Sequence, residues 1–178
     1  LLKFDTNSNR FLECQINPDD VSNSIGLDTR SIIEDQQGNL WLATHGLGLA
    51  KFNPKKSSFS FITKNEKDPK KSLSLDWQYD VLEDHKGNIW VATAYGLNKI
   101  KNDYTVDKYF YSENDTNSLS NSNIYTLYED SQNRIWVGTY SGLNKYNSKT
   151  DNFTRYLGIG TLGSSTICAI EEDNDNNL

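Results

Sequence analysis

Residues 83–93 read EDHKGNIWVAT, and this stretch decides the fold because it recurs twice without a gap. The other copies are EDQQGNLWLAT at residues 34–44 and EDSQNRIWVGT at residues 129–139. Their tryptophans, Trp41, Trp90 and Trp136, are separated by 49 and 46 residues. A period of about 40–50 residues is typical of propeller blades and longer than a helical-pair repeat. The sequence therefore predicts one β unit repeated along the chain.

Each copy has the pattern of two strands joined by a tight turn, with branched and aromatic residues on both sides of the turn. Gly38 and Gly87 supply the positive φ angle that the turn needs, and Asn133, a tolerant substitute, takes that place in the third copy. The strand after the turn is apolar throughout, so both of its faces are expected to be covered. A glycine-leucine step then leads into a third strand, and a fourth follows. The glycines of this step are Gly48, Gly96 and Gly142.

A small residue stands two positions after each of the three tryptophans. These residues are Ala43, Ala92 and Gly138, and we expect them to leave room for the large rings of an adjacent blade. A buried aromatic side chain removes about 150–250 Å² from water. The stacking of blades is therefore predicted to be the main source of stability.

The predicted fold is all-β, a partial β-propeller of four-stranded antiparallel blades with three full blades and two partial ones. The predicted boundaries are residues 1–25 for the second half of a blade, 26–70, 71–118 and 119–163 for full blades, and 164–178 for the start of the next. A closed propeller needs about four to eight blades. We therefore expect this chain to be a fragment completed by the remaining blades of its parent chain, or by a second copy in a homodimer.

Composition narrows the classes of partner. The 178 residues carry a net charge of −6, which argues against nucleic acid or an anionic membrane as a partner. No apolar stretch approaches the roughly 20 residues of a membrane span, so no direct membrane contact is expected. Cys14 and Cys168 lack the spacing of metal ligands. We expect two buried thiols instead of a disulfide, and no metal or cofactor.

These motifs resemble the two-component regulator propeller family, whose repeat is close to I-x-E-D-x-x-G-N-[LI]-W-[VLI]-[GA]-T-x-x-G-L-x-x-[YF]. The resemblance implies an extracytoplasmic, periplasmic or cell-surface sensor of a membrane-anchored bacterial receptor. In such receptors a small extracellular ligand, often a carbohydrate or oligosaccharide, signals to a histidine kinase or cyclase domain. This segment is then expected not to be an enzyme itself.

Candidate ligand contacts lie where the chain enters the first strand and leaves the second strand of a blade, because these loops open on one face. Trp77 stands where the other copies have Asp28, Asn123 and Thr166, and its ring could stack on a sugar. His45 and Tyr140 directly follow the recurring threonines, Tyr95 stands two positions after its threonine, and all three are predicted on the same face. For each of them, an ordinary packing or loop role is the alternative.

Other functions stay open at this stage. The recurring Glu-Asp pairs could suggest the two carboxylates of a glycosidase, but recurrence in every copy indicates a structural turn. The tail at residues 173–177 resembles the start of a calcium loop, yet it aligns with the same turns. The alternatives to a sensor are a propeller enzyme of sialidase or lyase type, or a propeller that only binds other proteins.

Overall fold

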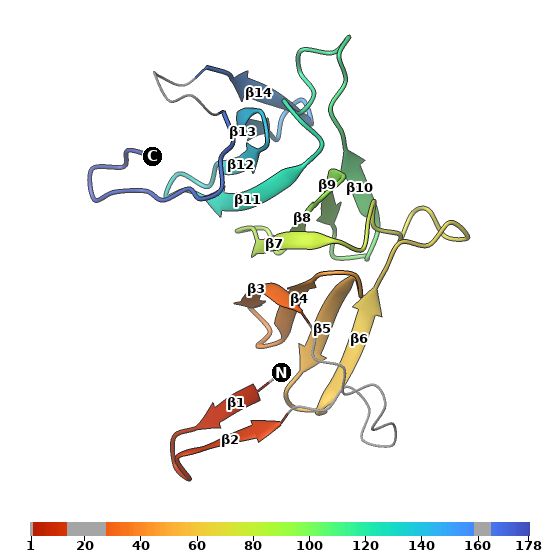
Figure 1. Ribbon diagram of the computed structural model, residues 1–178, viewed down its shortest axis with the longest axis vertical. Helices are drawn as coiled ribbons and strands as arrows, with labels where there is room; N and C mark the ends of the chain where they lie inside the picture. The colour runs from red at the N-terminus through yellow and green to blue at the C-terminus, as the bar shows by residue number, and fades with distance from the viewer. Residues whose placement is uncertain (1, 14–27, 159–164) are drawn as a thin grey trace.

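The computed structural model describes residues 2–13, 28–158 and 165–178, and every regular element in them is a β-strand (Figure 1). Three antiparallel four-stranded sheets follow one another along the chain. The first contains β3 (Thr29–Glu34), β4 (Leu40–Thr44), β5 (Leu49–Asn53) and β6 (Ser58–Ile62). The second contains β7 (Gln78–Glu83), β8 (Ile89–Thr93), β9 (Gly96–Ile100) and β10 (Val106–Tyr109). The third contains β11 (Ile124–Glu129), β12 (Ile135–Thr139), β13 (Gly142–Asn147) and β14 (Asn152–Tyr156).

A two-stranded sheet of β1 (Leu2–Asp5) and β2 (Arg10–Glu13) precedes them. The predicted class, an all-β partial propeller of four-stranded antiparallel blades, is confirmed. Within the described residues there is no helix long and apolar enough to span a membrane.

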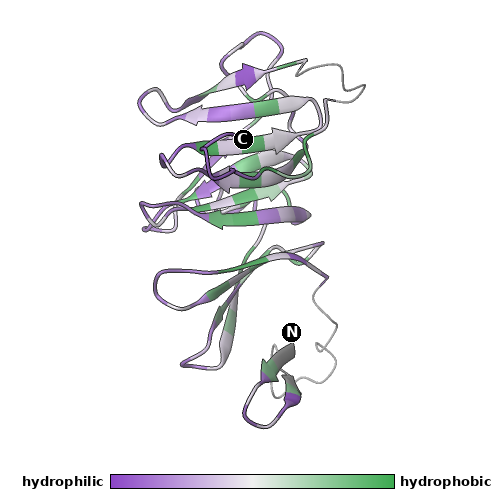
Figure 2. Ribbon diagram, turned by 90° about the vertical axis from the view of Figure 1, so that its left-hand side faces the viewer, coloured by the Kyte–Doolittle hydropathy of each residue, from purple (hydrophilic) through white to green (hydrophobic). Residues whose placement is uncertain are grey.

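The first strands of the three sheets, β3, β7 and β11, lie next to one another at the inner edges of the blades (Figure 1). All residues of β8 and β12 are buried, as expected of strands covered on both faces. Figure 2 shows the apolar residues concentrated in the strands and the polar residues at the connections. The ends of the strands are therefore the places where function can vary without disturbing the core.

The turn between the first two strands of each blade is built around its aspartate. Asp84 Oδ1 accepts hydrogen bonds from the backbone N–H groups of Lys86 and Asn88, and Asp84 Oδ2 accepts one from the Trp90 indole at 2.8 Å. The other two blades repeat the indole bond, Trp41 to Asp35 at 2.8 Å and Trp136 to Asp130 at 2.6 Å. The aspartate thus accepts hydrogen bonds from the backbone N–H groups of the turn, and it also orients the tryptophan ring.

The tryptophan rings join neighbouring blades. Trp41 shares a core cluster with Val81 and Ile89 of the second blade, and Trp90 shares one with Leu127 and Val137 of the third. Burial of apolar area at such contacts contributes roughly 25 cal/mol per Å². The packing of rings between blades is therefore a main contributor to stability.

The exposure of Ile32 shows which face of each sheet packs against the preceding blade. Val81 and Leu127 are buried, whereas Ile32, at the same place in the first sheet, is 48% exposed. Each later sheet turns this face toward the tryptophan of the sheet before it. Ile32 has no such tryptophan against it within the described residues, so this face of β3 stays open where the equivalent faces of β7 and β11 are covered.

The glutamate before each turn aspartate bonds to the preceding blade. Glu83 accepts a hydrogen bond from the backbone N–H of Gln36, Glu129 accepts one from that of His85, and Glu172 accepts one from that of Ser131. Each glutamate therefore stabilises the turn of the blade before it. This explains why the Glu-Asp pair recurs as a unit: the aspartate acts within its own blade and the glutamate acts between blades.

The space beside Gly138 is filled by Thr126 and Ile167, where the sequence predicted a large ring of an adjacent blade. A Cβ atom there would lie 2.5 Å from Thr126 Cγ2 and 2.8 Å from the backbone oxygen of Ile167. The space is thus occupied by the neighbouring first strand and by the chain at Ile167. The three atoms nearest to that position belong to Thr126 and Ile167, and none of them is part of an aromatic ring.

The last described segment, residues 165–178, repeats the turn chemistry without forming a strand. Asp173 accepts hydrogen bonds from Asp175 N and Asn177 N, as the turn aspartates do. Ile167 packs against the third blade, so its neighbour Cys168 points away from it and is exposed. The expectation of a buried thiol is therefore wrong for Cys168, and Cys14 lies outside the described residues.

We predict that Asp35→Asn lowers the free energy of unfolding by about 1–3 kcal/mol at pH 7, the cost of disrupting a buried hydrogen-bonded carboxylate. Burial alone would raise the pKa of Asp35, but hydrogen bonds from Asn39 and Trp41 and the charge of Lys51 outweigh it and hold that pKa below its ordinary value of 3.8. A lowered folded-state pKa adds stability above the unfolded-state pKa, and this stability is lost as the pH falls through the folded-state value.

The difference between wild type and Asp35→Asn should therefore narrow below about pH 4. Urea unfolding at pH 7 and pH 3, followed by tryptophan fluorescence, measures it. Asp68→Asn is the control, because Asp68 is exposed and should change stability by less than about 0.5 kcal/mol. Equal losses in the two variants would contradict the role given to the turn aspartate.

Candidate functional site

The four candidate ligand residues lie at one end of the blades, which we call the loop face and define by His45, Trp77, Tyr95 and Tyr140. Each blade forms the same backbone hydrogen bond there, between the residue after the recurring threonine and the residue before the first strand. The bonds are His45 N to Asp28 O, Ala94 N to Trp77 O and Tyr140 N to Asn123 O. The repeat therefore places His45, Ala94 and Tyr140 at equivalent points of successive blades, and Tyr95 is one residue further along.

Trp77 and His45 are in direct contact. Their ring centroids are 4.7 Å apart with an angle of 29° between the planes, and their backbones form an isolated antiparallel bridge. Trp77 is still 52% exposed. The imidazole thus holds the indole in place while leaving about half of its surface open to a ligand.

Tyr95 and Tyr140 are not part of that stack. Tyr95 is 59% exposed and packs against Phe110, with ring centroids 5.4 Å apart. Tyr140 is 56% exposed and makes no ring contact with another aromatic side chain of the described residues. The loop face therefore presents separate exposed rings on successive blades, with Trp77 and His45 as its best-ordered pair.

The structure adds residues that the sequence reasoning missed. Each first strand contains a bulge at its second residue, Arg30, Tyr79 or Tyr125. The rings of Tyr79 and Tyr125 lie 5.2 Å apart, although they belong to different blades. A β-bulge re-aims a side chain relative to its neighbours. The alignment of the repeats shows that these positions vary, but not that the bulges bring two of them together.

Charged and polar groups accompany the rings. Asp28 Oδ2 accepts a hydrogen bond from Arg30 Nη2 at 3.1 Å and lies 3.8 Å from His45 Nδ1. Two buried atoms near this face, Gln78 Nε2 and Asn123 Oδ1, have no hydrogen-bond partner among the described residues. An unpaired buried polar group is uncommon and is often explained by a water or a ligand. Rings with polar groups beside them suit a ligand that has both apolar faces and hydroxyl groups.

The loop face does not resemble a metal centre. No group of three or more His, Cys, Asp or Glu side chains that could hold a metal ion occurs in residues 2–13, 28–158 and 165–178.

Comparison with known proteins agrees with this geometry. Residues 23–46 and 118–141 match the family model of the two component regulator propeller. At these two segments the chain therefore carries two-component regulator propeller repeats. The matched segments contain the first two strands of the first and third blades, and they end at the loop face, just past His45 and Tyr140. The second blade, which carries Trp77, has the same strands outside the matched segments.

Solved structures contain similar repeats. A B. thetaiotaomicron extracellular domain, described as part of the hybrid two component system BT3049, is 28% identical with a TM-score of 0.71. The match covers 79% of this chain and 20% of that one. The extracellular domain of a one component system, BT4673, from the same organism is 22% identical with a TM-score of 0.66, over 83% of this chain and 21% of that one. This chain thus spans about a fifth of the length of either structure.

A more distant match shares the fold alone. Virginiamycin B lyase from Staphylococcus aureus is 14% identical with a TM-score of 0.55, over 75% of this chain and 43% of the lyase. No curated protein sequence matches the regulator propeller chain.

We predict that Trp77 accounts for most of the fluorescence quenching by acrylamide. Of the four tryptophans, Trp41, Trp90 and Trp136 are at most 7% exposed, whereas Trp77 is half exposed. Trp77→Phe should therefore remove most of the quenching and shift the remaining emission to shorter wavelength. Trp136→Phe is the matched control and should leave the quenching nearly unchanged. Strong quenching that persists in Trp77→Phe would show that the buried rings are accessible and would contradict the packing described above.

Proposed function

We propose that this chain is a ligand-sensing propeller segment of a bacterial signal-transduction receptor, and that its ligand binds on the loop face. The observation that carries the proposal is the exposed Trp77 ring, held by His45 among polar groups. The match to the regulator propeller model and the likeness to the extracellular domain of BT3049 support a sensor role. They also support a location outside the cytoplasm. Attachment to a membrane and a kinase or cyclase output belong to the same proposal.

We propose a carbohydrate or oligosaccharide as the ligand. A sugar ring has an apolar face of C–H groups, which packs on an aromatic ring, and hydroxyl groups around its edge, which need hydrogen-bond partners. Trp77 offers such a ring, and Asp28 and Arg30, which pair with each other next to His45, offer an acceptor and a donor. The rings of Tyr95 on the same blade and of Tyr140 on the next blade would suit a ligand of more than one sugar unit.

The positions of the carboxylates in the repeat support a binding role without catalysis. Asp35, Asp84 and Asp130 are at most 4% exposed, and each accepts several hydrogen bonds within its own turn. Such carboxylates are poorly placed to attack a substrate or to transfer a proton. The likeness to a lyase shows the fold only, so we do not assign a sialidase-type or lyase-type activity.

We further propose that the ring of blades is completed by other blades of the parent chain or by a second copy of this chain. Three four-stranded sheets are fewer than the roughly four blades that the smallest propellers contain.

Trp77→Ala should weaken oligosaccharide binding about tenfold or more, because a central stacked aromatic side chain commonly contributes over 1.4 kcal/mol to binding. The probes are neutral cello-, xylo-, manno- and arabino-oligosaccharides, screened by thermal shift and then measured by calorimetry. Tyr104→Ala is the control, because Tyr104 is also an exposed aromatic residue but lies at the opposite end of its blade.

We expect wild type and Tyr104→Ala to bind the same oligosaccharide equally well. Binding that is unchanged in Trp77→Ala would place the ligand elsewhere. If none of the probes binds and a protein partner binds through the loop face instead, the carbohydrate proposal is wrong and the protein-interaction alternative takes its place.

A further inference from the structure

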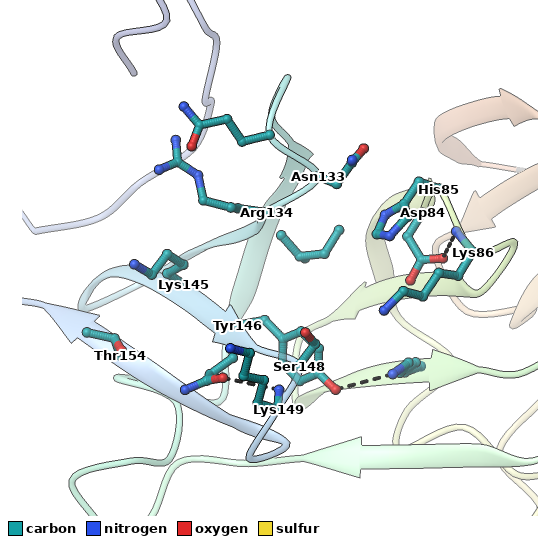
Figure 3. Close-up of a pocket in the computed structure, with 14 residues that line it drawn as sticks. Asp84, His85, Lys86, Asn133, Arg134, Lys145, Tyr146, Ser148, Lys149 and Thr154 are labelled. Atoms are coloured by element: carbon teal, nitrogen blue, oxygen red, sulfur yellow. Dashed lines mark hydrogen bonds between the residues drawn. The ribbon is translucent and has the colours of Figure 1, made fainter.

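The face opposite the loop face carries a cavity of about 660 Å³ between the second and third blades (Figure 3). We call it the turn-face cavity and define it by Lys86, Lys99, Arg134, Lys145 and Lys149, the cationic side chains that line it. They come from the β7–β8 turn, β9, the start of β12, β13 and the β13–β14 turn. The protein as a whole has a net charge of −6, so this concentration of positive charge is unusual for it.

The lysines of the turn-face cavity have no carboxylate partner. Within the described residues, no ion pair involves Lys86, Lys99, Lys145 or Lys149. Lys99 lies over the rings of Trp90 and Tyr146 and donates a hydrogen bond to the Tyr146 hydroxyl. Like charges brought together without a counter-charge repel one another, so an anion that enters the cavity relieves this repulsion.

The acidic groups nearby are already engaged. Asp84 is the one carboxylate in the lining, and it is buried and bonded to Asn88 and Trp90. Arg134 donates from Nε to Asp130, while its two terminal nitrogens make no hydrogen bond to the described residues. Burial and the hydrogen bond to Asp151 raise the pKa of Tyr146, so this phenol stays neutral. The cavity therefore offers lysines that form no ion pair within the described residues, and the carboxylates near them, Asp84, Asp130 and Asp151, already accept hydrogen bonds.

The corresponding place between the first and second blades shows the contrast. That cavity measures about 100 Å³, and Tyr104 lines it. Its lysines are paired, Lys51 with Asp35 at 3.5 Å and Lys101 with Asp107 at 2.9 Å. The interface between the first two blades thus contains only a small cavity, and the charges of its lysines are balanced by aspartates. The wide, unpaired cavity is particular to the second and third blades.

We propose that the turn-face cavity binds a small molecule through an oxyanion group, a sulfate, phosphate or carboxylate. Its volume lies within the roughly 300–1,000 Å³ of ordinary ligand pockets. Lysine offers a point charge to such a group, and the free edge of Arg134 offers paired N–H donors. This site is separate from the loop face and does not depend on the function proposed for that face.

The test compares two double variants that remove the same charge. Lys86→Gln with Lys149→Gln changes two exposed lysines of the cavity, and Lys55→Gln with Lys56→Gln changes two exposed lysines at the β5–β6 turn. Lys55 occupies, in the first blade, the position that Lys149 occupies in the third. The probes are inorganic sulfate, inorganic phosphate, glucuronate, glucose 6-sulfate and uncharged glucose. Binding is measured by calorimetry at low ionic strength, and circular dichroism verifies folding.

We expect wild type and the Lys55/Lys56 variant to bind sulfate equally and saturably, and the Lys86/Lys149 variant to bind it at least tenfold more weakly. Tighter binding of glucose 6-sulfate than of sulfate would identify a sugar-borne anion, and equal binding would identify the free ion. Glucose alone should not compete. The proposal is overturned if no anionic probe binds, if both double variants lose affinity equally, or if the protein binds phosphatidylglycerol vesicles but none of the small anions.

Discussion

The hydrogen bond from the tryptophan indole to the turn aspartate is the interaction on which the rest of the structure depends. It spans six residues, joins the turn to the second strand and leaves the ring facing the next blade. An indole N–H buried without a partner would cost about 1–3 kcal/mol. Because the aspartate removes that cost, the whole ring can be buried between two sheets. The same carboxylate closes the turn, so one residue serves both the hairpin and the stack.

The glutamate next to that aspartate extends the arrangement from one blade to the next. Glu129 is bonded to His85, and His85 lines the turn-face cavity. The contact between the second and third blades and the wall of the cavity therefore share a residue. At the other end, Trp77 of the second blade rests on His45 of the first. Both candidate sites thus lie where two blades meet, because only there do side chains from different repeats converge.

The two faces differ in chemistry although the repeat that produces them is the same. The buried strands tolerate few substitutions, because a changed side chain there disturbs packing on both faces of the sheet. The residues at the strand ends are free to differ, and they give exposed rings on the loop face and unpaired lysines on the turn face. Net charge alone argued against nucleic acid or an anionic membrane as a partner. A total of −6 says nothing about where individual charges gather.

The fold class, the turn at Gly87 and the burial of Trp90 could be read from the sequence alone, because a pattern that recurs with one period must serve contacts that every blade makes. The common face of Trp77, His45, Tyr95 and Tyr140 followed from the same periodicity. The sequence could not show that Trp77 stacks on His45, that Cys168 is exposed, or that Thr126 and Ile167 fill the space beside Gly138. It also could not show that five cations line one cavity. Those features depend on the distances between residues of different blades, and only the packed structure sets these distances.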